Sequence, residues 1–401
     1  MKRISVEGLS KAGLRRPEMN VQVIITADNH LDPPATMFGA KRFERKRDHL
    51  RCFEEVMEYA KKEKPDLLLL AGDVFDTVKP SNFVRARFMQ HMKQLHERGV
   101  KVVMVSGHHD TPKSAEEGVS PLAVYGRSGY AYFIQDPNSL EYFSLEVDGC
   151  EVVVAGLGHN PLLRPFEDPL ATVKVEKRGD VNILLLHYPV EGFVGVYGEE
   201  PVVRLNSIPK TFQLVAVGHL HRHQIKRLGD AAVVYPGSTE RVSFAEEEEP
   251  KGFVWAELNR EGLVSLDHVK TQARPYKTIE TMFPEKDTIE RLKQVIDQHA
   301  DPQLVLRLVV KGVVEAEKLT EYRRSELLLH AQTRLFHLIV DESGLELKSP
   351  EIPSTLEKTT PLEELRRYFS ALMQNASAEE REILAEALRR SEGMLREAGA
   401  W

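Results

Sequence analysis

The segment DLLLLAGDVFD at residues 66–76 joins a nearly continuous apolar run to a polar end, and it decides how the fold is interpreted. Two other segments repeat this pattern, VQVIITADNH at residues 21–30 and KVVMVSGHHD at residues 101–110. Segments with helical periodicity lie between these runs, at residues 41–63 and 82–98. Such alternation predicts a sheet that is buried on both faces, with ligand chemistry at the carboxyl ends of its strands.

More strands follow along the chain, so the sheet is expected to be large and mixed. Their apolar runs are EVVVAGL, NILLLHY, FQLVAVGH and AAVVYPG, within residues 151–237. Shorter runs punctuated by turn residues lie between them and indicate antiparallel pairs. The length of 401 residues indicates two or three domains, at roughly 100–200 residues per domain.

Near Arg274 the polar strand ends stop, and a second pattern predicts a small α+β domain. Its expected elements are a strand at 276–281, a helix at 286–299, a strand at 303–310, a helix at 316–331 and a strand at 334–340. We therefore expect a basic N-terminal extension, a first domain and a second domain, at residues 1–20, 21–273 and 274–346.

A proline-bearing linker at residues 347–359 and a helical pair at residues 360–401 are expected to complete the chain. Thr360 and Ser377 each precede a glutamate by three residues, which is the spacing of a capping box at a helix start. Each helix has one narrow apolar stripe. Such a pair cannot bury its stripes alone, so it docks on this chain or on a partner.

The composition excludes some kinds of partner. The chain has 54 Lys+Arg against 61 Asp+Glu, and this net charge of −7 argues against a nucleic-acid coat or a polybasic membrane binder. A local basic groove stays open. Only Cys52 and Cys150 are present, too few for a disulfide framework. With neither an apolar signal segment nor a run of about 18 apolar residues, we expect a soluble protein of the reducing cytoplasm.

Asp and His residues gather at the ends of five apolar strands. Residues i and i+2 of an extended segment point to the same side, so Asp28 and His30 can offer two ligand atoms to one site. Carboxylates mixed with imidazoles suit Mn²⁺, Fe²⁺ or Zn²⁺, and Asp73 is the candidate bridge between two metals. Each motif alone is common, and a lone His187 is more often structural, so the interpretation depends on their conjunction. The clusters are Asp28-Asn29-His30, Gly72-Asp73-Val74-Phe75-Asp76, Gly107-His108-His109-Asp110, His187 and Gly218-His219-Leu220-His221.

The order of these motifs resembles the calcineurin-like metallophosphoesterase superfamily over roughly residues 21–240. More narrowly, AGDVFDTVKP, LLLHYPV, VGHLHRHQ and YPGSTERVSFAEEEEPKGF are similar to the SbcD family, the bacterial relatives of the meiotic-recombination-eleven DNA repair nuclease. The terminal TPLEELRRYF resembles the tail of the same family. The resemblance implies a four-layer αββα sandwich with a small α+β capping domain and a C-terminal helical pair.

The resemblance also implies roles for single residues. His109 would be the catalytic histidine, and Asp110 would orient its imidazole or support its loop, with a simple turn role as the alternative. Asp76 could contact the site from outside the ligand shell. Metal one would be held by Asp28, His30, Asp73 and His221, and metal two by Asp73, His187, His219 and the residue at position 108.

Position 108 departs from the family pattern. The family has G-N-H-D where this sequence has Gly107-His108-His109-Asp110. An imidazole keeps a neutral ligand there, but it favours Mn²⁺, Fe²⁺ or Zn²⁺ over Mg²⁺. We expect two Mn²⁺ ions, with Fe²⁺ or Zn²⁺ as substitutes, and an impaired second site is the alternative.

The segment KRFERKRDHLR at residues 41–51 carries an excess of basic residues close to the first metal loop. Such a helix start could hold DNA phosphates in a sequence-independent way, and a solvated helix face is the alternative. The acidic run EEEE at residues 246–249 is expected to be an exposed loop. The candidate DNA-binding residues are Lys41, Arg42, Arg45 and Arg47.

These features predict a two-metal phosphodiesterase, a DNA exonuclease or endonuclease that acts on ends or hairpins in double-strand-break repair. The resemblance implies an SbcC-like SMC ATPase bound by residues 360–401, a DNA-capping second domain, and a homodimer formed through the nuclease domain. It also implies a nucleoid-associated place in the cytoplasm without membrane contact. A phosphodiesterase for small substrates and a non-catalytic DNA-end scaffold with a decayed second metal site are the alternatives.

Overall fold

The computed structural model describes residues 20–176, 178–196, 199–229, 231–315, 318–319, 322–348, 360–374 and 376–397. The chain divides into two compact units. One unit contains two six-stranded sheets and a three-stranded sheet, and the other contains the C-terminal helices. The predicted N-terminal extension and linker lie outside the described residues, except for residues 20, 347 and 348.

The first six-stranded sheet has the order β12-β11-β1-β2-β3-β4. Its strands β1 to β4 run parallel, while β11 is antiparallel to β1 and to β12. All of the residues of β2 are fully buried, as expected for a strand with both faces covered. The strands are β1 (Val21–Thr26), β2 (Leu67–Ala71), β3 (Lys101–Val105), β4 (Tyr132–Ile134), β11 (Gly252–Asn259) and β12 (Gly262–Lys270).

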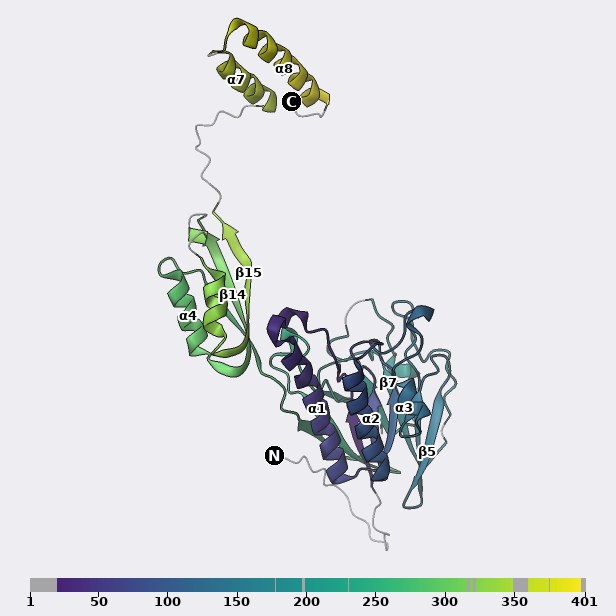
Figure 1. The fold of residues 1–401 in the computed structure, drawn as a ribbon. Helices are drawn as coiled ribbons and strands as arrows, with labels where there is room; N and C mark the ends of the chain where they lie inside the picture. The colour runs from purple at the N-terminus through teal and green to yellow at the C-terminus, as the bar shows by residue number, and fades with distance from the viewer. Residues whose placement is uncertain are drawn as a thin grey trace. The chain divides into compact units, whose positions relative to one another are not determined.

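Helices cover the outer face of this sheet, and Figure 1 shows α1 and α2 side by side there. The buried apolar residues of α1 recur every three or four positions, as at Phe53, Met57 and Ala60, and they pack on Leu68 and Leu70 of β2. The helices are α1 (Arg42–Glu63), α2 (Asn82–Glu97) and α3 (Ala123–Arg127), with the 3-10 helices η1 (Thr36–Lys41) and η2 (Ala115–Glu117).

The second six-stranded sheet has the order β5-β6-β7-β8-β10-β9. The sequence pattern alone indicated one large mixed sheet and the family resemblance implied two packed sheets; the structure has two. Alternate residues such as Ile25 and Leu69 of the first sheet pack on Val154 and Leu185 of the second, which forms the central core. The strands are β5 (Glu141–Val147), β6 (Cys150–Gly156), β7 (Val181–His187), β8 (Leu214–Gly218), β9 (Gln224–Leu228) and β10 (Ala231–Tyr235).

The outer face of the second sheet is covered mainly by loops. Side chains such as Tyr188, Phe193 and Phe212 pack there, and within the described residues the only helical turn among these loops is η3 (Leu205–Ser207). The expected α/β fold with two packed layers of strands is confirmed, but this fourth layer is not built from long helices. Prolines recur through residues 161–209, and proline interrupts a helix.

The three-stranded sheet has the order β13-β14-β15, with β13 parallel to β14. Apolar residues of α4 and α6, such as Ile296 and Leu327, pack on Leu306 and Leu308 of β14. The predicted helix at 316–331 is not continuous, because residues 322–323 are not helical. The elements are β13 (Tyr276–Met282), α4 (Thr288–Gln298), β14 (Asp301–Val314), α6 (Arg324–Ala331) and β15 (Leu335–Leu347).

A short turn at residues 244–247 contacts this smaller sheet. The ring of Phe244, in η4 (Phe244–Glu246), lies 4.8 Å from the ring of Tyr276 at the start of β13. Glu247 accepts a hydrogen bond of 2.6 Å from Thr278 of the same strand. The turn therefore joins the sandwich to the three-stranded sheet.

The C-terminal unit contains α7 (Pro361–Gln374) and α8 (Ala378–Glu397), which pack on each other. Both predicted capping boxes are present, and in the first the backbone N of Thr360 donates to Glu363 at 2.7 Å. Tyr368, Ile383 and Met394 are exposed. No helix in the described parts of the chain is long and apolar enough to cross a membrane.

Candidate metal centre

The loops after β1, β2 and β8 turn sharply at the predicted ligands. Asp28, His30, Asp73 and His219 have φ angles of 49°, 43°, 46° and 97°, in the left-handed region that residues other than glycine rarely adopt. Such strain concentrates at functional sites, where the surrounding structure holds it. Here the backbone N of Asp28 donates to the carbonyl of Gly72, and that of His30 to the carbonyl of Asp73, at 3.1 and 3.0 Å.

Two glycines allow these loops to approach closely. A Cβ atom on Gly218 would lie 2.0 Å from the carbonyl O of Ala71, and one on Gly72 would lie 2.3 Å from Nδ1 of His187. Both distances are below any normal contact, so a side chain at either position would push the strand ends apart. Gly72 and Gly218 belong to the motifs found in the sequence, and the structure gives the steric reason why glycine stands at both positions.

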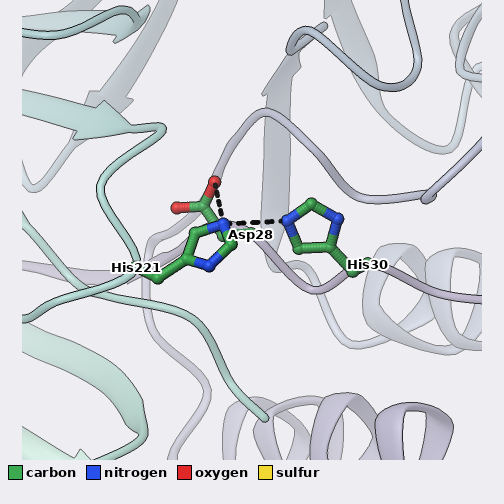
Figure 2. Close-up of side chains that lie close together, drawn as sticks. All are labelled: Asp28, His30 and His221. Atoms are coloured by element: carbon green, nitrogen blue, oxygen red, sulfur yellow. Dashed lines mark hydrogen bonds and ion pairs between the residues drawn. The ribbon is translucent and has the colours of Figure 1, made fainter. Parts of the chain in front are cut away.

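One cluster of possible ligand atoms joins Asp28, His30 and His221, whose ligand atoms all lie within 4.8 Å of one another. The Nε2 atoms of His30 and His221 are 3.0 Å apart, and Nε2 of His221 lies 4.0 Å from Oδ1 of Asp28 (Figure 2). Asp28 and His30 are almost fully buried. Two imidazole nitrogens and a carboxylate thus converge on one point.

A second cluster joins Asp28, Asp73 and His187, so it shares Asp28 with the first. Nδ1 of His187 donates to the carbonyl O of Ala71 at 2.7 Å, which turns Nε2 toward Oδ2 of Asp73, 3.3 Å away. This buried Nε2 atom has no hydrogen-bond partner. A buried imidazole nitrogen that faces a carboxylate without a hydrogen bond is a pair of ligand atoms suited to a cation.

The electrostatics of the second cluster also favour a cation. Burial alone would lower the pKa of His187, but the nearby carboxylates of Asp73 and Asp28 raise it to about 10. Burial likewise opposes ionisation of Asp73, yet His187 and His30 hold the pKa of Asp73 well below its usual range. The residues present therefore fit a divalent cation with mixed nitrogen and oxygen ligands.

The other two predicted ligands lie beside these clusters. Nε2 of His219 contacts Glu200 at 2.9 Å, and its ring centroid is 5.5 Å from that of His187. His108 is exposed, and its ring stacks on that of His159 at 5.6 Å. The three ligand clusters found among the described residues contain neither His219 nor His108.

The third cluster joins His30, Asp76 and His109. The ring of His109 is partly exposed and packs edge-on against that of His30 at 4.8 Å. Its Nδ1 lies 3.3 Å from the carbonyl O of Asp76, and its backbone N donates to Asp73 at 2.7 Å. The predicted catalytic histidine therefore lies at the edge of the cluster and is tied to it through its backbone.

The carboxylate of Asp110 is hydrogen-bonded to the backbone of two loops. Its buried carboxylate accepts hydrogen bonds from the backbone N atoms of Gly107 and Val74, at 2.6 and 2.9 Å. Burial and the charge of Asp73 raise the pKa of Asp110 to about 7. Of the two roles that we predicted for Asp110, the contacts fit the structural one.

Arg45 differs from the other predicted DNA-binding residues. Its side chain is 2% exposed, and its guanidinium lies 3.2 Å from Asp48 and 3.3 Å from Glu240. A buried charge that is already paired is not available to a DNA phosphate. We therefore remove Arg45 from the predicted DNA-binding residues. Arg42 and Arg47 are exposed, and Lys41 is half-exposed and pairs with Glu44.

Sequence reasoning missed two acidic residues that contact the candidate ligands. Glu246 lies within the acidic run that we expected to be exposed, but it is 7% exposed and contacts Nδ1 of His221 at 2.9 Å. Burial alone would raise the pKa of Glu246, but His221 and Lys251 lower it to about 2. Glu200 contacts His219. No local sequence signal separates Glu246 from its three acidic neighbours.

A cavity of about 350 Å³ adjoins the second cluster. Its lining includes His187 and His219, together with Lys113, His159 and Glu200. Nδ1 of His159 is buried without a hydrogen-bond partner. Burial and the neighbouring His187 lower the pKa of His159 to about 3, so this ring is neutral.

The chain belongs to the calcineurin-like phosphoesterase family, whose model matches residues 21–223. The matched segment includes all of the predicted metal ligands, from Asp28 to His221. The chain is therefore a phosphoesterase, and its family implies that it binds divalent metal ions.

The chain is also similar to proteins named DNA double-strand break repair protein Mre11. The protein of Methanococcus maripaludis is 26% identical over 344 residues, which are 81% of this chain and 88% of that protein. Its counterpart in Methanocaldococcus jannaschii is 27% identical over 282 residues, 68% and 72% of the two chains. That of Sulfurisphaera tokodaii is 20% identical over 382 residues, 92% and 93% of the two chains.

Proposed function

We propose that this chain is a metal-dependent DNA nuclease subunit that hydrolyses phosphodiesters at DNA ends or hairpins in double-strand-break repair. The observation that carries the proposal is that the carboxylates of Asp28 and Asp73 lie together with the imidazoles of neighbouring histidines at the carboxyl ends of the strands. The relatives named for double-strand break repair support DNA as the substrate.

In this proposal two Mn²⁺ ions are the cofactors, and Fe²⁺ or Zn²⁺ can replace them. When bound, the metals polarise the phosphodiester and lower the pKa of an attacking water. Asp73 would be the ligand common to both sites: its Oδ2 lies 3.3 Å from Nε2 of His187 and 4.0 Å from Nε2 of His30, although the first two clusters have Asp28 in common. Metal one is assigned to Asp28, His30, Asp73 and His221, and metal two to Asp73, His187, His219 and His108.

His109 is the general acid in this proposal. The contact between its Nδ1 and the carbonyl of Asp76, at 3.3 Å, places a hydrogen on Nδ1. Nε2 is then the ring atom that holds and delivers a proton to the leaving oxygen. A positioned general acid contributes about 10²–10⁴-fold to a rate.

The cavity beside His187 receives the substrate next to the scissile bond, and Lys113 at its wall offers a positive charge to a phosphate. Lys41, Arg42 and Arg47 contribute further phosphate contacts. The domain at residues 274–346 acts as the DNA cap. Residues 360–401 bind an SbcC-like SMC ATPase through the apolar stripes of α7 and α8, and the nuclease domain forms a homodimer in the cytoplasm.

A second candidate function is a non-catalytic DNA-end scaffold. The position of His108 favours it, because this ring stacks on His159 outside the three ligand clusters. In this alternative the second metal site is decayed, and the protein binds DNA and its partner without cleavage.

Cleavage of hairpin and linear double-stranded DNA with Mn²⁺ tests both candidates, with metal stoichiometry measured in parallel. The variants are His108→Asn, His109→Ala and the control His96→Ala, which changes an exposed histidine of α2. Loss of cleavage in His109→Ala alone supports the nuclease with His108 as a ligand. An inactive parent that regains cleavage in His108→Asn supports the scaffold.

A variant that lacks residues 350–401 tests the DNA specificity of the proposal against a phosphodiesterase for small substrates. The nuclease subunit is expected to lose stimulation by the ATPase on DNA and to retain its own metal-dependent hydrolysis. Full activity of the truncated chain on every substrate, including DNA with the ATPase present, would favour the small-substrate enzyme.

A further inference from the structure

A buried ion pair lies directly behind His221. Glu246 and Lys251 are 2.6 Å apart, and their side chains are 9% and 0% exposed. The other oxygen of Glu246 accepts a hydrogen bond of 2.9 Å from Nδ1 of His221. Nζ of Lys251 also donates to the carbonyl O of His221, at 3.1 Å. The pair thus contacts both the side chain and the backbone of one candidate ligand.

These contacts fix the direction of the imidazole. Because the carboxylate of Glu246 can only accept, the hydrogen of His221 lies on Nδ1, and Nε2 is left to bind a cation. Nε2 is the atom that lies 3.0 Å from Nε2 of His30 (Figure 2). Asp76 holds Nδ1 of His30 at the same distance of 2.9 Å, so both imidazoles of the first cluster are oriented by carboxylates.

The ion pair also explains why Glu246 is buried. An unpaired carboxylate would be costly in this place, and Lys251 offsets its charge. A lysine that bonds the carboxylate and the backbone carbonyl together restricts rotation of Glu246 and movement of the His221 loop. Glu249 of the same acidic run also pairs with Lys251, at 3.3 Å, but Glu246 is the residue of the run that contacts the imidazole of His221, and Glu248 is exposed.

We propose that Glu246 is a positioning residue for the first metal site, anchored by Lys251, and that it acts by holding His221 in the orientation that binds the metal. The inference rests on the proposed function, because it takes His221 as a ligand. Carboxylates behind metal-binding histidines raise metal affinity, and their removal typically weakens binding about 10–100-fold.

Titration of the full-length, metal-free chain with MnCl₂ by calorimetry tests the proposal. Glu246→Gln is expected to weaken the binding of one Mn²⁺ by about 10–100-fold relative to the parent chain, while the matched control Glu248→Gln binds as the parent does. The visible absorption of bound Co²⁺ reports ligand geometry, and it should change in Glu246→Gln only.

A second background separates positioning from a general structural role. In a chain that carries His221→Ala, adding Glu246→Gln should weaken Mn²⁺ binding no further. An equal loss in both backgrounds overturns the proposal, and so does unchanged binding in Glu246→Gln. If that variant does not fold, Glu246→Asp is titrated instead. It keeps the charge but withdraws the carboxylate by one methylene, so weaker binding supports the proposal and unchanged binding overturns it.

The parent chain distinguishes this inference from the proposed function. A parent that binds no Mn²⁺ refutes the proposed function and the inference with it. If the parent binds Mn²⁺ and Glu246→Gln binds it equally well, the positioning role alone is refuted and the proposed function is retained.

Discussion

Replacing Arg45 by methionine should destabilise the protein without acting through DNA contacts. The guanidinium of Arg45 is buried between Asp48 and Glu240, and it also donates to the carbonyl of Arg241. Methionine retains most of the aliphatic packing but removes the charge. Arg274 still pairs with Asp48 at 2.6 Å in this variant. Glu240 is therefore the carboxylate whose buried negative charge loses its arginine partner.

The size of this effect follows from that arrangement. Removing one partner of a buried ion pair typically costs about 3–5 kcal/mol, against a total stability of roughly 5–15 kcal/mol. Because Glu240 still accepts hydrogen bonds from the backbone N of Arg274, we expect the lower end, about 3 kcal/mol. At roughly 2 °C per kcal/mol for a large domain, Tm falls by about 6 °C.

Urea and thermal unfolding of the metal-free chain measure this change. The control is Arg47→Met, two residues away on the exposed face of α1, where the free energy of unfolding should change by less than about 0.5 kcal/mol. Arg45→Met combined with Glu240→Gln should lose less stability than the sum of the single changes. Equal stability of Arg45→Met and Arg47→Met would refute the reasoning.

Three further predictions concern the metal centre. Mn²⁺ at about 100 times its dissociation constant should raise the free energy of unfolding by about 2.7 kcal/mol per site. Thermal unfolding with and without a chelator measures this change, and an unchanged Tm would contradict the prediction. Gly218→Ala should cost about 1–3 kcal/mol and weaken Mn²⁺ binding, because its Cβ would lie 2.0 Å from the carbonyl O of Ala71. The control Gly393→Ala, in a helix with open space around the new Cβ, should be neutral or stabilising in the same unfolding assay. His109→Ala should lower single-turnover DNA cleavage about 10²–10⁴-fold with unchanged Mn²⁺ stoichiometry, because its backbone N still holds Asp73; loss of a metal would count against this role.

The sequence predicted those parts of the site that depend on local order. An apolar run such as LLLLA drives a strand through the core and delivers Asp73 at its end, and the same local rule places Asp28, His187 and the loop of His219. The capping boxes of the C-terminal helices were predicted for a similar reason, because each needs only two residues three positions apart.

Features that depend on distant parts of the chain could not be predicted in this way. Arg45 resembles its basic neighbours in sequence, and only the approach of Glu240, far along the chain, makes it a buried ion-pair partner. Glu246 resembles the other acidic residues of its run until the His221 loop packs on it. The division of the strands between two sheets likewise depends on long-range pairing, which alternation along the sequence does not specify.

The turn η4 has a consequence for how the two parts of the larger unit communicate. Glu246 faces His221 in the metal centre, while Phe244 and Glu247 hold β13 of the three-stranded sheet. Coupling free energies between two sites are reciprocal. A cation at His221 that restrains this turn also restrains β13. A ligand that immobilises β13 then raises the affinity for the cation by the same factor by which the cation raises the affinity for that ligand.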